Sequence, residues 1–395
     1  MLGAGTMGGG IAYVAADKGV EVRMKDINND ALARGFKAAR DIWKKKMDRK
    51  QLDPYEFETR MGRVSGALDF SQFDKQDVVV EAIVEDMNVK KKVIAETAQH
   101  MAPTAIMATN TSSLSVNEMA EAAPRPENFV GMHFFNPVDK MPLVEVIRGD
   151  KTSDEAVATI FEVTKKMGKT PVVVKDGPGF LVNRLLLPWL AEAMFFLEDG
   201  MHVPSVDKIF THQFGMPMGP YRLMDEIGLD VAIKVLKIFK KSLGERIQVP
   251  AVQDKVAASG RLGCKSKKGF YLYDKNPRDG EFDPTVYTDL GLGDRNGKLT
   301  AEEMIERSFF QMINEAARAL YEDHIVDTPE QVDLAMIMGT GFPPFRGGLL
   351  RYADHVGSTY VCERLDEYAT RYGIRFKPCP ALQTMAKNNK SFYGK

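Results

Sequence analysis

The sequence predicts an α/β domain with a parallel sheet, followed by an all-α C-terminal region built from two related helical domains. Three observations carry this prediction: a glycine-rich turn that leads into a helix, a series of short apolar runs in the first half of the chain, and an internal echo between helical segments in the second half. We place the domains at residues 1–178, 179–290 and 291–395. A chain of 395 residues is too long for one ordinary core, which agrees with this division.

A glycine-rich turn opens the chain. Residues 3–8 read Gly-Ala-Gly-Thr-Met-Gly and match G-x-G-x-x-G, and residues 11–18 continue as a helix. In this pattern the first glycine permits a tight turn, the second lets the backbone approach a pyrophosphate, and the third lets the helix pack against a strand. The pattern predicts a dinucleotide site of the Rossmann type. The contacts expected from the turn itself are Gly3, Gly5, Thr6, Met7 and Gly8.

An acidic residue follows this turn at the spacing of a nicotinamide dinucleotide site. Residues 20–24 form a short strand that leads to Asp26, which lies 18 positions after Gly8. A carboxylate there accepts hydrogen bonds from ribose hydroxyls and repels a 2′-phosphate, which favours NAD over NADP. The alternative is an ordinary exposed acid at a strand end.

Further apolar runs predict buried parallel strands. Only Met1 and Leu2 precede the glycine-rich turn, so we expect the first strand of the fold to be nearly missing. The later runs cover residues 78–83, 105–109, 129–135 and 143–147. Ligands of open α/β sheets bind at the carboxyl ends of the strands. The strand ends bring four polar side chains to that edge: Glu85, Ser112, His133 and Asn136.

One histidine and one glutamate stand out within these runs. Oxidation of an alcohol requires a base for the hydroxyl proton, and histidine suits this role because it titrates near neutral pH. His133 is the one histidine of six that falls in the strand pattern, and Glu145, 12 residues later, interrupts an apolar strand. Pairing would orient the imidazole and stabilise its protonated form. The alternative is a core histidine and a surface glutamate.

Four motifs together resemble the L-3-hydroxyacyl-CoA dehydrogenase family. They are Asn-Thr-Ser-Ser at 110–113, Met-His-Phe-Phe-Asn-Pro at 132–137, Leu-Val-Glu-Val-Ile at 143–147 and Asp-Gly-Pro-Gly-Phe-Leu-Val-Asn-Arg at 176–184. The resemblance covers the whole chain and is strongest to the dehydrogenase part of the multifunctional fatty-acid oxidation protein of the α-subunit type. We see no enoyl-CoA hydratase domain in the chain and assign no hydratase activity.

The resemblance implies a role for each matching residue. His133 is expected to be the catalytic base and Glu145 its partner, while Ser112 and Asn183 are expected to bond the oxygen of the substrate. Asn136 would support the site beside the histidine. Besides the glycine-rich turn, the cofactor contacts implied are Asp26, Glu85, Lys90 and Asn110. Lys90 has an alternative as a surface helix lysine.

The basic helix predicted over residues 31–50 has two interpretations. Its lysines, Lys45 among them, are typical of a solvated helix face. The other interpretation is a contact from Lys45 to the phosphates of a CoA nucleotide.

The second half of the chain contains an internal echo. Helical patterns cover residues 185–198, 231–243, 302–321 and 360–372. The clearest matches are residues 190–193 with 313–316, Asp207 with Asp333, and Asp225 with Asp354. We place a linker at residues 276–298, which are rich in Gly, Asp and Pro. In single-copy members of the family this helical domain forms the dimer interface, so the resemblance implies that the two copies pack against each other in a pseudo-twofold manner.

The leading interpretation is an NAD-dependent enzyme of fatty-acid β-oxidation that oxidises L-3-hydroxyacyl-CoA to 3-ketoacyl-CoA. Two alternatives stay open: another β-hydroxyacid-type dehydrogenase, and a non-catalytic CoA-binding fragment of a multienzyme protein. The expected partners are an acyl-CoA substrate and a thiolase, without nucleic acid or a membrane span. We expect a monomer or homodimer in a bacterial-type cytoplasm, an organelle being the alternative for a eukaryotic source.

Overall fold

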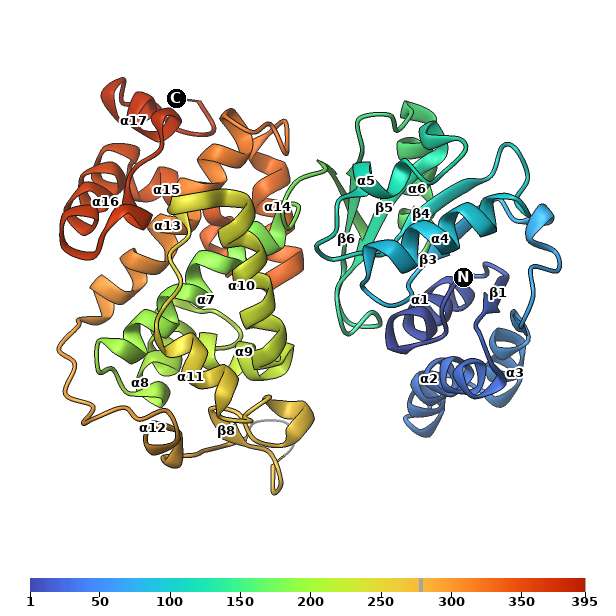
Figure 1. Cartoon of the computed structure of the whole chain (residues 1–395), viewed down its shortest axis with the longest axis horizontal. Helices are drawn as coiled ribbons and strands as arrows, with labels where there is room; N and C mark the ends of the chain where they lie inside the picture. Colours follow the sequence, from blue (N-terminus) through green and yellow to red (C-terminus); the bar gives the residue numbers. More distant parts are fainter. Residues whose placement is uncertain (277–279, 395) are drawn as a thin grey trace. The chain divides into compact units, whose positions relative to one another are not determined.

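The structure, a computed structural model, describes residues 1–276 and 280–394 (Figure 1). The chain divides into two compact units, Met1–Phe180 and Leu181–Lys395. The first unit is α/β and the second is almost entirely helical. Among the described residues, no helix has the length and apolar character needed to cross a membrane.

A seven-stranded arrangement forms the centre of the first unit. The strands are β1 (Val22–Lys25), β2 (Val64–Ala67), β3 (Val78–Glu81), β4 (Ile106–Thr109), β5 (Phe129–Phe134), β6 (Leu143–Arg148) and β7 (Thr170–Lys175). The pair β1–β2 is parallel, and the other five strands follow the order β3-β4-β5-β6-β7. Strands predicted from the sequence correspond to β1, β3, β4, β5 and β6, whereas β2 and β7 were missed. β2 has four residues and no apolar run, whereas the valines of β7 (residues 172–174) follow a proline and form a run of only three.

Leu2 takes the place of the first strand between the two groups. It bridges both Lys25 and Glu81 in parallel, and its N–H and C=O bond to Val80 and Ala82. The sheet is therefore continuous in the order β2-β1-Leu2-β3. The expectation of a nearly missing first strand agrees with this single bridging residue.

The parallel prediction fails for one strand. β6 runs antiparallel to β5, and then β7 runs parallel to β6. The loop at residues 135–142 is too short for the crossover that a parallel neighbour requires. Because of this reversal, His133 and Glu145 become direct cross-strand partners.

Helices surround this sheet, and most of them have a side-chain cap. They are α1 (Thr6–Asp17), α2 (Asn29–Asp48), α3 (Pro54–Met61), α4 (Met87–Ala98), α5 (Val116–Ala120) and α6 (Asp154–Lys166), with short 3₁₀ turns η1 (Phe73–Lys75) and η2 (Pro126–Asn128). Asn28, Asp53, Asp86, Ser115 and Ser153 each accept a backbone N–H at a helix start. In contrast, α1 begins at Gly5 without a side-chain cap, which leaves its first N–H groups available to a ligand.

The second unit consists of helices with one small hairpin. The first half holds α7 (Val182–Glu198), α8 (Val203–Lys208), the π-helical turn η3 (Ile209–Phe214), α9 (Pro220–Ile227), α10 (Leu229–Leu243), η4 (Gly244–Arg246), α11 (Val252–Ala258), η5 (Cys264–Ser266), β8 (Tyr271–Leu272), β9 (Glu281–Phe282) and α12 (Thr285–Asp289). The second half holds α13 (Ala301–Tyr321), α14 (Pro329–Thr340), η6 (Pro344–Arg346), α15 (Leu349–Val356), α16 (Ser358–Tyr372), η7 (Ile374–Phe376) and α17 (Pro380–Lys387). The predicted linker contains β9 and α12, and its residues 277–279 lie outside the described residues.

Two buried ion pairs connect the two halves of the helical unit, and in each pair one half supplies the arginine and the other half the glutamate. Arg184 on α7 bonds to Glu315 on α13 at 2.7 Å, and Arg307 on α13 bonds to Glu192 on α7. Both pairs are buried. The arginines and the glutamates are related by the same offset, 307 − 184 = 315 − 192 = 123. A contact of residue i with j′ and of i′ with j is the signature of twofold symmetry, here within one chain.

A second feature repeats between the halves. Asp207 accepts the N–H groups of Tyr221 and Arg222 and the hydroxyl of Tyr271. Its counterpart Asp333 accepts those of Leu350 and Arg351 and the hydroxyl of Tyr393, with Tyr271 and Tyr393 as the matching tyrosines. In each half, an equivalent buried aspartate thus binds the start of a helix and a tyrosine from a later segment.

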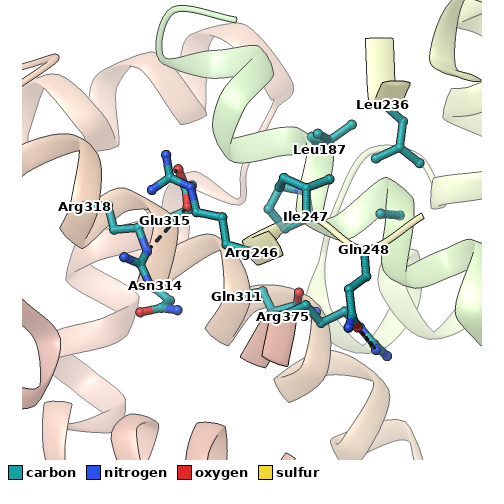
Figure 2. Close-up of a pocket in the computed structure, with 12 residues that line it drawn as sticks. Leu187, Leu236, Arg246, Ile247, Gln248, Gln311, Asn314, Glu315, Arg318 and Arg375 are labelled. Carbon is teal, nitrogen blue, oxygen red and sulfur yellow. Dashed lines mark hydrogen bonds and ion pairs between the residues drawn. The ribbon is translucent and has the colours of Figure 1, made fainter. Parts of the chain in front are cut away.

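A cavity lies where the two halves meet, and Figure 2 shows its lining. It is bordered by α7, α13, η4 and η7, with Leu187, Gln311, Arg246 and Arg375 among the lining residues. Its interior volume of about 30 Å³ is enough for water but far too small for an acyl-CoA substrate. The cavity is therefore a packing feature of the paired helices.

Candidate active site

The glycine-rich turn has the geometry that a bound pyrophosphate needs. Gly3 adopts φ +88°, and a Cβ there would lie 2.5 Å from the carbonyl oxygen of Ala82. A Cβ on Gly8 would lie 2.0 Å from the carbonyl oxygen of Gly3, so both positions require glycine. A Cβ on Gly5 would meet nothing within 4 Å. The space beside Gly5, at the uncapped start of α1, is thus open on the side from which a phosphate would approach.

Asp26 lies at the end of β1 beside this turn. Its Oδ2 accepts the N–H of Ala4 and its Oδ1 accepts that of Ile27, both at 2.7 Å. Each carboxylate oxygen keeps a further lone pair for a ribose hydroxyl. The structure therefore brings Asp26 to the turn, as the spacing in the sequence predicts.

Glu85 connects the end of β3 to the loop after β4. Its Oε1 accepts the hydroxyl of Thr111 at 2.6 Å and the N–H of Ser112 at 3.1 Å. Burial raises the pKa of the Glu85 carboxyl, but the Lys90 ammonium and these two hydrogen bonds outweigh it and hold the pKa below its usual value. Glu85 is therefore an anion that fixes the Ser112 loop.

Lys90 lies below the surface of this edge. Its side chain is 1% exposed, and its ammonium lies 2.7 Å from Glu81 and 3.3 Å from Glu85. Glu81, also buried, accepts the hydroxyl of Thr109 and the N–H of Ile83. Lys90 is thus not the surface lysine of the alternative interpretation, and its direct contact with a cofactor stays a prediction. Sequence reasoning did not single out Glu81, although this glutamate interrupts the predicted apolar run at residues 78–83 as Glu145 interrupts its own run.

Asn110 holds the strand that carries the histidine. Its Oδ1 accepts the N–H of Phe134 at 2.8 Å, just beyond the last paired residues of β4 and β5. The predicted cofactor contact of Asn110 stays a prediction, but its side chain already fixes the neighbour of His133 in place.

His133 and Glu145 form a buried pair. They are register partners in the antiparallel pair β5–β6, and Nδ1 of His133 lies 2.8 Å from Oε2 of Glu145. The imidazole side chain is 6% exposed and the carboxylate 0%. The ring also contacts Phe135 and Phe180, with centroids 4.5 Å and 5.7 Å away. A proton on Nδ1 shared with the carboxylate leaves Nε2 as the nitrogen that accepts a proton from a substrate.

The other predicted residues are placed as follows. Asn136 is exposed in the loop after β5, where it precedes the cis peptide bond to Pro137. Lys45 is exposed on α2, and Ser112 is exposed at the strand edge. Asn183 lies in the first turn of α7 and belongs to the helical unit. Of the predicted site, His133, Glu145, Asp26, Glu85, Ser112 and Asn110 are fixed within the first unit.

Sequence reasoning also missed an apolar group at this edge. Ile27, Leu68 and Val84 follow β1, β2 and β3 and are 85%, 49% and 63% exposed. Large apolar side chains at the carboxyl ends of three neighbouring strands are unusual for a solvated surface. The sequence offered one signal for this group: each of these residues is a large apolar side chain within a segment that follows a strand.

The chain matches both family models and curated relatives of one protein family. Residues 1–177 match the 3-hydroxyacyl-CoA dehydrogenase NAD-binding domain. The C-terminal domain of the same family matches residues 179–273 and again 304–392. The fatty acid oxidation complex subunit alpha of Idiomarina loihiensis is 43% identical over 394 residues, which cover 100% of this chain and 55% of that protein. The chain thus spans about half the length of the curated relatives it matches.

Solved structures agree with this assignment. A 3-hydroxybutyryl-CoA dehydrogenase from Escherichia coli is 29% identical with a TM-score of 0.85, over 98% of both chains. The (S)-3-hydroxybutyryl-CoA dehydrogenase from Ralstonia eutropha is 34% identical with a TM-score of 0.67, over 69% of this chain and 97% of that one. The chain described here belongs to the 3-hydroxyacyl-CoA dehydrogenase family, a family of NAD-dependent oxidoreductases.

Proposed function

We propose that the chain oxidises an L-3-hydroxyacyl-CoA to the 3-ketoacyl-CoA with NAD⁺. The observation that carries the proposal is the buried contact of 2.8 Å between His133 and Glu145 in a register-fixed strand pair. Burial keeps water from competing for the imidazole, and the carboxylate favours its protonated form. A base placed in this way suits proton removal from a secondary alcohol.

The residues of the first unit fit NAD. The Gly5 opening and the uncapped start of α1 would hold the pyrophosphate, and Asp26 would hold the ribose hydroxyls. Ile27 and Val84 supply apolar surface for the adenine ring. When bound, NAD⁺ supplies the acceptor for the hydride that leaves the substrate.

The remaining roles extend the same scheme. His133 takes the hydroxyl proton through Nε2, while Glu145 holds the ring and balances its charge. Ser112, in the loop fixed by Glu85, would bond the substrate oxygen together with Asn183. Lys45, exposed on α2, is available to the phosphates of the CoA nucleotide.

We also propose that the second helical copy takes the place that a partner subunit fills in single-copy relatives. Residues 179–290 and 291–395 would form the two domains, and the exchanged Arg–Glu pairs of α7 and α13 support their pairing. On this proposal the chain is a monomer or associates through another surface. Sedimentation that shows an obligate dimer built on α7 and α13 would contradict it.

The relatives' names support a place in fatty-acid oxidation, with a thiolase as the proposed partner and the bacterial cytoplasm as the proposed location. The test of the function is the absorbance of NADH formed from NAD⁺ and L-3-hydroxybutyryl-CoA. Turnover supports the proposal. NADH binding without turnover of any 3-hydroxyacyl-CoA would favour the non-catalytic alternative, and turnover of only a free hydroxy acid would favour another dehydrogenase.

A further inference from the structure

The loop at residues 135–142 joins the two strands of the catalytic pair. β5 carries His133 into the loop and β6 carries Glu145 out of it. The N–H groups of Lys140 and Met141 both bond to the carbonyl of Pro137, so the loop is a closed turn. Asn136 lies at its start.

The same loop packs against the helix of the glycine-rich turn. Val138 is buried, with 4% exposure, and belongs to the core shared with α1. A Cβ on Gly10 would lie 3.0 Å from Cβ of Val138, so these two residues are already in direct contact. A displacement of the loop would therefore act on both the catalytic strands and the cofactor helix.

Lys169 fixes this loop from the other side. Its ammonium donates to the carbonyl of Val138 and, at 2.7 Å, to that of Met141. The following residue, Thr170, donates its N–H to the carbonyl of Pro142 at 2.8 Å. Burial lowers the pKa of the Lys169 ammonium, while the nearby Asp139 opposes this shift. Placing this cation in a half-buried site to bond two loop carbonyls is costly for a group with no further role.

We propose that Lys169 is a positioning residue for the dehydrogenase reaction, which holds the loop between the His133 and Glu145 strands against α1. It touches neither member of the pair, and no motif used above includes it. Lys169 holds Val138, which contacts Gly10 of α1, and it also holds the turn that begins at Asn136. The inference rests on the proposed function.

The test compares Lys169→Met with Lys169→Arg and with Lys166→Met, which removes an exposed lysine of α6. We expect Lys169→Met to raise KM for NAD⁺ and to lower kcat, with a total loss in kcat/KM of about tenfold to a hundredfold. Lys169→Arg, which can still donate to both carbonyls, should recover much of the loss. Lys166→Met should match the wild type.

Gly10→Ala supplies a second variant that leaves the lysine in place. Its Cβ would push on Val138, so it should also raise KM for NAD⁺, and its effect should not add to that of Lys169→Met. A Lys169→Met protein with a lowered Tm but unchanged kcat and KM would overturn the inference and leave Lys169 a purely structural residue. Additive effects of the two variants would overturn it as well. An inactive wild type would instead count against the proposed function.

Discussion

Nδ1 of His133 lies 2.8 Å from Oε2 of Glu145, and the two residues face each other across the antiparallel pair β5–β6. The backbone ladder sets this distance, so neither side chain has to be ordered by the substrate. A site preorganised in this way keeps its geometry before the reaction starts.

Glu145→Gln tests what the carboxylate contributes. The amide keeps the shape and one hydrogen bond to Nδ1 but removes the charge that stabilises the protonated imidazole. We expect kcat to fall by about tenfold to a thousandfold, with a smaller change in KM for the acyl-CoA. Steady-state rates measure this, and an unchanged kcat would show that Glu145 is a packing residue only.

Asp26→Ser tests the choice of cofactor. The substitution removes the carboxylate that would bond the ribose hydroxyls and repel a 2′-phosphate. KM for NAD⁺ should rise about tenfold, and the preference for NAD⁺ over NADP⁺ should shrink. The control is Asp30→Ser, which removes an exposed acid from the first turn of α2. Equal effects of the two variants would argue against a specific role of Asp26.

Arg307→Met tests the pairing of the helical copies. The substitution leaves the buried Glu192 carboxylate without its main cationic partner. Only the hydrogen bonds from Gln311, at 2.9 Å, and Arg375, at 3.0 Å, then offset the burial of its charge. We expect a loss of about 3 kcal/mol in the free energy of unfolding, and a similar loss for the mirror variant Arg184→Met. Lys165→Met, which breaks the exposed pair with Glu162, should cost at most about 0.5 kcal/mol. Losses as small as this control for both arginines would contradict the exchanged-pair account.

Two buried carboxylates predict a pH dependence of stability. Burial raises the pKa of Asp207 to about 7 and that of Asp225 to about 6, above the values of the unfolded chain. Folding then favours the protonated acids, so their contribution is full below the unfolded pKa of 3.8 and is lost as the pH rises from there through the folded values of about 6 and about 7. Urea unfolding should show this loss between about pH 4 and about pH 7.

Asp207→Asn should flatten that slope. Asp254→Asn, at a side chain that is 81% exposed, should leave it unchanged. If the wild type gained stability over the same interval, the hydrogen bonds from Tyr271 and the backbone would outweigh burial.

Much of the first unit follows from local sequence signals. Gly3 and Gly8 are required by contacts within the turn, and His133 and Glu145 stand out because each interrupts an apolar strand. The apolar run of β6 does not by itself reveal the direction of the strand, since such a run looks the same in either direction. The short loop at 135–142 was the signal for an antiparallel strand, and it was overlooked.

The buried charges were harder to predict. Lys90, Arg184 and Arg307 lie in helices, where a charged residue usually faces water. Their partners are fixed by tertiary packing: Arg184 meets Glu315 131 positions later, and Arg307 meets Glu192 115 positions earlier. The internal echo showed that the two copies are related, but not which of their side chains meet.

The most direct measurement compares the wild type with His133→Gln in two assays. Glutamine fills the space but cannot serve as a base, so kcat for NADH formation from L-3-hydroxybutyryl-CoA should fall by about a thousandfold or more. The Kd for NADH should stay within about twofold of the wild type, because the glycine-rich turn and Asp26 are untouched. Retained turnover, or loss of NADH binding together with turnover, would contradict the role of His133 as the base.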